Sequence, residues 1–155
     1  MRSLRILTFA LLALVGAFLV WNWYSWHRIS RGYEVDPETQ ISYLRTQLSE
    51  DLGYSGFDPT SLQKAWINGF SDHTYLFLIS PTSTDFTSAI EKVAGTEPIS
   101  ASYFRDGGYL GPSTAPRWWD TVRIDAADAL YFRKESHLWR FTWIEGRLYI
   151  VLSAA

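Results

Sequence analysis

The longest apolar stretch of the chain lies near its N-terminus, between residues 6 and 26. From Ile6 to Val20 it carries no charged side chain, and its only polar side chain is Thr8. As a helix with a rise of about 1.5 Å per residue it covers roughly 30 Å, which is the thickness of the hydrocarbon layer of a bilayer. We therefore expect residues 1–31 to form a single-pass transmembrane anchor.

A cleaved signal peptide is the alternative for this stretch, because Val15, Gly16 and Ala17 form a sequence that signal peptidase accepts. The apolar residues continue beyond it, however, into a group of aromatic side chains. A mature chain beginning at Phe18 would expose that group to water, which is unfavourable. We therefore favour an uncleaved signal-anchor, with an interface belt at the lipid headgroups formed by Trp21, Trp23, Tyr24 and Trp26.

Two further features of the expected anchor concern partners. Small side chains occupy part of one face, as in helices that pack closely in membranes, and they belong to Ala10, Ala13, Gly16 and Ala17. Ordinary lipid-facing composition is the alternative interpretation of this seam. His27 lies among the tryptophans, where it is either an interfacial histidine or a contact to a pigment or haem.

Charge separates the anchor from the rest of the chain. All sixteen acidic residues follow position 31, together with ten of the fourteen Lys and Arg, so residues 32–155 carry a net charge of 10 − 16 = −6. A domain this acidic repels phosphate backbones, which argues against nucleic-acid binding. A short basic N-terminal tail followed by a long acidic domain favours a cell-membrane protein whose domain, 32–155, lies on the extracytoplasmic, or periplasmic, side.

The spacing of apolar residues predicts an amphipathic helix over residues 37–52. Asp36 is placed to cap it, Pro37 suits its first position and Gly53 its end. The apolar stripe consists of Ile41, Leu44, Leu48 and Leu52. The polar face has few basic residues, so we expect this helix to pack on protein rather than on lipid.

The middle of the chain predicts mixed structure. Residues 55–73 are rich in turn formers, with one short helical turn at Asp58-Pro59. A strand at 73–80 is nearly all apolar, which indicates burial on both faces. A helix at 81–95, capped by Thr82 or Ser83 and ended by Gly95, separates it from a strand at 98–104, so these two strands are candidates for a parallel crossover unit.

The C-terminal pattern predicts three strands, at 129–135, 138–144 and 147–153. The Glu145-Gly146 dipeptide fits a two-residue hairpin turn, which fixes the pairing of the last two strands. The expected pairs, all on one face, are Trp143 with Leu148, Phe141 with Ile150 and Trp139 with Leu152; Arg140, Thr142, Arg147 and Tyr149 form the opposite face. The fold class expected is α+β, with an antiparallel or mixed sheet packed by two helices on one side.

The sequence carries no catalytic signature, and we predict neither an enzyme nor a cofactor or metal site. It has no cysteine, and its three histidines lack metal-ligand spacing. The glycine-rich segment 107–112 has no phosphate-binding pattern. The carboxylates Asp120, Asp125 and Asp128 allow a hydrolase or a cation site as an alternative, but they also fit a solvated turn.

The loop at 105–120 ends in two adjacent tryptophans followed by an acid: Trp118, Trp119 and Asp120. Two neighbouring indoles do not easily enter one core, so we expect one to cover the sheet and the pair, with Asp120, to offer a protein contact. A sugar-stacking platform is the alternative use of such rings.

Together these features predict a non-catalytic accessory subunit that packs beside a larger integral-membrane complex and stabilises it. Photosynthetic and respiratory assemblies are hosts of this kind. A membrane-anchored binding or sensor module for an envelope glycan or peptide, using the Trp118/Trp119 loop, is the second hypothesis, and a hydrolase is the third.

Overall fold

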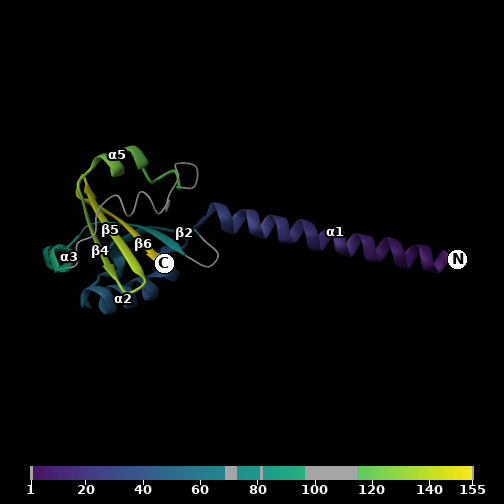
Figure 1. The fold of residues 1–155 in the computed structure, drawn as a ribbon, viewed down its shortest axis with the longest axis horizontal. Coiled ribbons are helices and arrows are strands. Elements are labelled where there is room, and N and C mark those ends of the chain that lie inside the picture. Colours follow the sequence, from purple (N-terminus) through teal and green to yellow (C-terminus); the bar gives the residue numbers. More distant parts are fainter. Residues whose placement is uncertain (1, 69–72, 81, 97–114, 155) are drawn as a thin grey trace.

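A computed structural model of the chain describes residues 2–68, 73–80, 82–96 and 115–154. A long helix, α1 (Arg2–Arg31), projects from a small α+β domain, and the two chain ends lie far apart (Figure 1). The domain consists of a six-stranded antiparallel sheet and helices packed on it, which confirms the α+β class.

The described sheet has the strand order β1-β2-β3-β6-β5-β4, and each neighbouring pair is antiparallel. Its strands are β1 (Tyr33–Val35), β2 (Leu62–Asn68), β3 (Thr74–Ile79), β4 (Ala129–Lys134), β5 (His137–Ile144) and β6 (Arg147–Ala154). The central pair, β3 with β6, joins the N-terminal half of the domain to the C-terminal half. The strand expected at 98–104, and with it the parallel crossover, lies outside the described residues.

The β5–β6 hairpin has the expected register. Trp143 lies opposite Leu148, and the other two predicted pairs are also present. Glu145 and Gly146 both have positive φ, at 51° and 74°, as a tight turn with the twist of a hairpin requires. The two-residue turn therefore sets which side chains of both strands face the core.

Helix α2 (Pro37–Leu52) has the predicted bounds and caps. The Asp36 carboxylate accepts a hydrogen bond from the Glu38 backbone N–H at 3.1 Å, and Gly53 ends the helix in the left-handed conformation. Its stripe packs on the sheet, with Leu44, Leu48 and Leu52 buried. Packing on protein, as expected, gives this helix its stability.

Two shorter elements follow the predicted capping residues closely. The turn after Asp58 is the 3-10 helix η1 (Pro59–Ser61), and helix α3 (Thr84–Thr96) begins after Ser83. The Ser83 hydroxyl accepts a hydrogen bond from the Phe86 N–H, which selects Ser83 over Thr82 as the cap. The helix includes Gly95, which was expected to end it.

One face of the sheet is covered by α2 and α3. Its core contains Leu48 from α2, Ile90 from α3 and a row of aromatic rings from the sheet. The rings of Phe132, Trp139 and Phe141 stack nearly parallel, with centroids 5.5 to 5.9 Å apart. This is the aromatic inner face that the hairpin register predicts.

The other face corrects the expectation that helices cover one side. Helix α5 (Thr121–Ala126) lies across the sheet from α2 and α3 (Figure 1), and its Ile124 is fully buried. Thr142 and Tyr149, expected on the face opposite the aromatic pairs, are buried there. A second core cluster covers this face, formed by Trp66, Leu76, Leu78, Trp119, Ile124, Leu138, Tyr149 and Val151. The short helix was missed because its six residues are too few to show a helical period.

Strands β1 and β2 were also missed, since turn formers surround them. β1 has three residues, and β2 carries Gln63 and Lys64 beside its apolar positions. Both segments are strands because each has a neighbouring strand as partner. β2 pairs with β3 over its length, and β1 pairs with β2. Tertiary context decides short strands of this kind.

The expectation of a transmembrane helix at 1–31 is not supported. Within the described residues, no helix combines the length and the apolar character needed to cross a membrane. The expectation includes the aromatic belt in the span of residues 6–26, but Asn22 and Ser25 interrupt the apolar side chains there.

Candidate functional site

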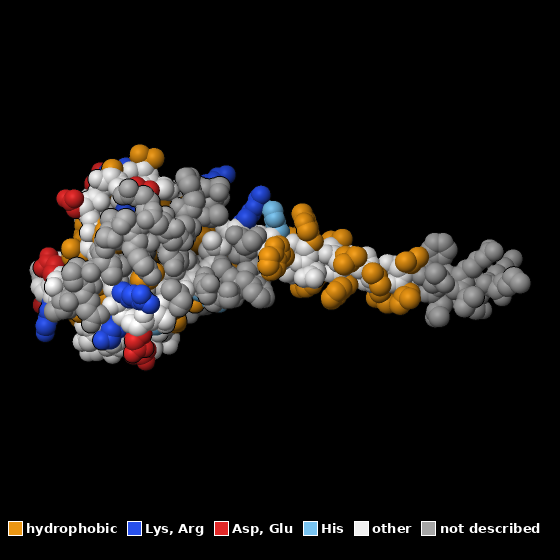
Figure 2. Space-filling view, viewed as in Figure 1, with side chains coloured by type: hydrophobic (Ala, Val, Ile, Leu, Met, Phe, Trp, Pro, Cys, Tyr) orange, Lys and Arg blue, Asp and Glu red, His pale blue; other side chains and the backbone are white. Residues whose placement is uncertain are grey.

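The large apolar side chains of helix α1 are exposed. From Leu11 to Trp26 their exposed fractions run from 49% for Val15 to 70% for Trp21. Figure 2 shows these side chains as an orange surface between the domain and the end of the helix. Because successive residues turn by about 100°, the large apolar side chains point to all sides of α1. A helix that is apolar all round is typically surrounded by other apolar material.

The small side chains of α1 share one side of the helix. At about 100° per residue, Ala10, Ala13, Gly16 and Ala17 fall within about a third of the circumference. All four are exposed. Bulky residues such as Leu11, Phe18 and Val15 fall on the opposite side. The four small residues predicted to form a seam therefore do lie on one side of α1. Their use in helix packing stays a prediction.

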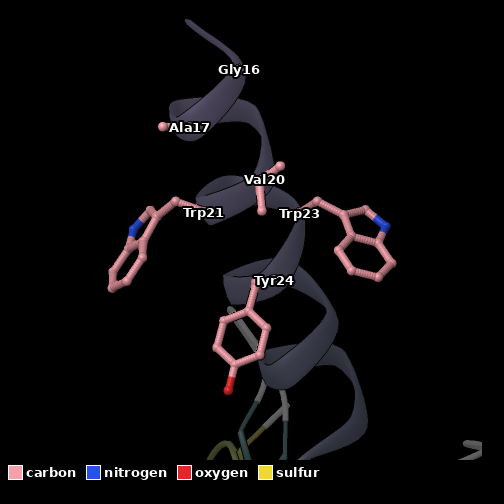
Figure 3. A pocket seen from close by; sticks show the side chains of 6 residues that line it. All are labelled: Gly16, Ala17, Val20, Trp21, Trp23 and Tyr24. Atoms are coloured by element: carbon pink, nitrogen blue, oxygen red, sulfur yellow. The ribbon is translucent and has the colours of Figure 1, made fainter. Parts of the chain in front are cut away.

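A shallow apolar hollow of about 430 Å³ lies on this side of α1. Figure 3 shows Val20 between the rings of Trp21 and Trp23, which point away from each other, while Tyr24 lies one turn further toward the domain. Gly16 and Ala17 complete the lining. The hollow exists because the side chains of Gly16 and Ala17 are small and leave space next to the large rings.

The predicted interface belt forms a collar near the domain end of the helix. Trp21, Trp23, Tyr24 and Trp26 are between 56% and 70% exposed. The His27 ring stacks on Trp23, with centroids 5.3 Å apart and planes 13° apart. A pigment or haem contact at His27 stays a prediction.

The two tryptophans of the predicted contact loop have different environments. Trp119 is 6% exposed and packs edge-on against Tyr149 at 5.6 Å, so it belongs to the core. Trp118 is half-buried, and its Nε1 is buried without a hydrogen-bond partner among the described residues. Asp120 caps α5 by accepting from the Arg123 N–H at 3.1 Å. Trp118 and Asp120 are thus the members of this group left at the surface.

The three candidate catalytic aspartates have separate environments and share no partner among the described residues. Asp120 caps α5, and Asp125 forms an ion pair with Arg140 at 2.9 Å. Arg140 also donates to the Ile124 carbonyl, so this pair fastens α5 to β5. Asp128 is exposed. Among the described residues, no group of three or more acidic or histidine side chains is arranged to hold a metal ion.

A polar cluster that sequence reasoning missed lies where α2 ends over the sheet. One carboxylate oxygen of Asp51 accepts from Trp139 Nε1 and pairs with His137 Nδ1, both at 2.8 Å. The Asp51 side chain is 7% exposed and that of His137 is 22% exposed. These residues are more than eighty positions apart in sequence, so no local spacing could reveal them.

Two tyrosines lie beside this cluster. The rings of Tyr43 and Tyr75 stack with centroids 4.5 Å apart. Burial, the Tyr75 phenol and the Asp51 charge raise the pKa of Tyr43, and burial raises the pKa of Tyr75. Both phenols therefore remain neutral in the folded protein at ordinary pH.

Comparison with known proteins yields no match: no family model, curated protein or solved structure is similar enough to this chain to be matched.

Proposed function

We propose that this protein is a non-catalytic accessory subunit that α1 attaches to a larger integral-membrane complex. The observation that carries the proposal is the exposed apolar surface of α1 from Leu11 to Trp26. In this proposal the exposed apolar surface of α1 packs against helices of the complex, and the domain 32–155 lies at the extracytoplasmic surface and stabilises the complex there.

The extent of that surface supports the proposal. Sixteen helical residues form a cylinder about 24 Å long and about 10 Å wide, with roughly 750 Å² of side surface. The largest apolar patch on a typical monomer is about 300–600 Å². A surface on the scale of a whole protein interface, roughly 800 Å² per partner, is expected to be covered in the cell.

The distribution of side chains along α1 supports a complex rather than lipid alone. The small residues Ala13 and Ala17 lie on one side, where a neighbouring helix can approach closely. Leu11 and Phe18 lie on the other side, where flexible acyl chains fit. The collar of Trp21, Trp23, Tyr24 and Trp26 then lies at the lipid headgroups.

The test is gentle solubilisation of membranes from cells that make the protein, followed by native electrophoresis and identification of what comigrates. We expect a stoichiometric large membrane complex. Ala17→Glu, which places a charge on the small side of α1, should release the protein from it. Val122→Glu, at a position on the domain that is 80% exposed, is the matched control and should leave the association intact.

Three outcomes would contradict the proposal. The protein could run alone in mild detergent, a high-salt wash could release it, or mass spectrometry could show a mature chain beginning at Phe18. Each would mean that α1 does not hold this protein in a membrane assembly.

The second hypothesis, a membrane-anchored module that binds an envelope glycan or peptide, relies on the Trp118/Trp119 loop. Trp119 is buried and Trp118 is half-buried, which weakens a two-ring stacking platform. A monomer that binds glycan, with binding lost in Trp118→Ala, would favour this hypothesis over the accessory subunit.

A further inference from the structure

Gly32 is the only residue between the end of α1 and the start of β1. Its φ is +73°, a conformation that glycine adopts readily and other residues rarely do. Tyr33, Glu34 and Val35 then pair with β2. The chain thus passes from helix to sheet without the several polar or flexible residues that usually link independent parts.

The indole of Trp66 packs against Gly32. A Cβ atom on Gly32 would meet three atoms of that ring, among them Cε2 at 2.5 Å and Cη2 at 2.6 Å. These distances are too short for any side chain at position 32 unless the ring moves. Gly32 is therefore required twice, for its φ and for the space that the ring fills.

Trp66 itself has little freedom to move. It is 3% exposed and lies in β2, opposite Glu34 of β1 on one side and Leu76 of β3 on the other. Its side chain belongs to the second core cluster, with Trp119 and Ile124. Because this core is close-packed, the Trp66 ring cannot move aside, and it restricts the position of Gly32.

We propose that Gly32 and Trp66 form a fixed-angle joint that makes α1 and the sheet one rigid body. The contact blocks rotation at the single linking residue, and the β1–β2 pairing blocks the next three. Whatever binds α1 then receives the domain in one orientation. This inference does not depend on the proposed function, because the joint is internal to the chain.

The test uses spin labels, which the absence of native cysteines makes straightforward. One label is placed on α1 by Asn22→Cys and one on the domain by Val122→Cys, both exposed positions, in the full chain in mild detergent. Pulsed electron resonance should give a narrow distance distribution for this pair. A second pair within the domain, Glu50→Cys with Val122→Cys, reports whether the domain is folded.

Variants of the joint sharpen the test. Gly32→Ala and Trp66→Leu should each abolish the narrow α1–domain distribution, and the double variant should be no broader than either single one, since all three lose the same contact. Gly53→Ala is the matched control: its φ is +66°, but a Cβ there would meet nothing within 4 Å. It should keep the narrow distribution.

The wild-type chain can overturn the proposal without any variant of the joint. A broad α1–domain distribution beside a narrow within-domain distribution would mean that α1 swings freely. A narrow α1–domain distribution in Gly32→Ala, with the domain folded, would also overturn it, because the angle would not depend on this contact.

Discussion

The same residue types have opposite environments in α1 and in the domain. Leu48 of α2 is fully buried, whereas Leu14 of α1 is 69% exposed; Trp139 of β5 is fully buried, whereas Trp21 is 70% exposed. The domain covers its own apolar side chains on both faces of one sheet. For the described part of α1, the chain provides no such cover.

The difference follows from how apolar residues are distributed along each helix. In α2 they form one stripe, and the sheet is wide enough to bury it. In α1 they surround the helix, and no single face of a small domain can cover all sides at once. The free energy of unfolding should therefore depend on the domain residues, and the proposed attachment on the α1 residues, with little overlap between the two.

The largest expected effect is that of Trp139→Ala. It removes a ring that stacks on both Phe132 and Phe141 and also a hydrogen-bond donor to Asp51. We expect a loss of about 4 kcal/mol in the free energy of unfolding. Chemical denaturation of the full chain in mild detergent, followed by far-ultraviolet circular dichroism, measures this.

The matched control is Trp21→Ala on α1, which should change the free energy of unfolding by less than about 0.5 kcal/mol. Comparable losses in the two variants would contradict the comparison, because they would show that α1 is part of the cooperative core.

A slightly smaller effect is expected for Asp51→Ala. Without the carboxylate, the Trp139 N–H and the His137 ring nitrogen lose their acceptor in a mostly buried position. Buried groups left without partners cost about 1–3 kcal/mol each, so we expect a loss of about 3 kcal/mol. Glu50→Ala, one residue earlier and exposed, should cost almost nothing. An equal cost for both would mean that the cluster contributes nothing specific.

The elements that the sequence predicts well are those whose determinants are local. Asp36, Pro37 and Gly53 mark the ends of α2, and the Glu145-Gly146 turn specifies the β5–β6 register. Each depends on a few neighbouring residues and on backbone conformations that few residue types adopt.

The elements that the sequence misses depend on distant contacts. β1 is a strand because β2 is beside it, and α5 buries its Ile124 in the cluster that also contains Trp119 and residues of the sheet. The Asp51 cluster joins the end of α2 to β5. For α1 the helix itself is predicted, whereas its expected ability to cross a membrane is not supported by the described residues.

A pH-dependent prediction tests the tyrosine pair beside Asp51. Because the folded state raises the pKa of Tyr43, the folded chain keeps a phenol proton that the unfolded chain releases. That contribution to stability is complete below the unfolded value of about 10 and is lost as pH rises above it. Tyr43→Phe should therefore lose less stability than wild type at higher pH, measured as urea midpoints at successive pH values.

Leu14→Ala, at an exposed position without a titratable side chain, is the control for this measurement, and its pH dependence should follow that of the wild type. If Tyr43→Phe also follows the wild type above pH 10, the buried phenol is not a source of alkaline instability.

The smallest effect on stability is expected for Leu14→Ala, and it tests the comparison most directly. Leu14 is 69% exposed, so removing its side chain leaves no cavity, and the free energy of unfolding should change by less than about 0.5 kcal/mol. Leu48→Ala makes the same chemical change in the core and should cost about 3 kcal/mol. Partition into lipid vesicles should show the reverse order, weaker for Leu14→Ala and unchanged for Leu48→Ala while the domain stays folded. If Leu14→Ala destabilises the fold as much as Leu48→Ala, then α1 is covered by the domain, and attachment to a membrane complex is no longer needed to explain its apolar surface.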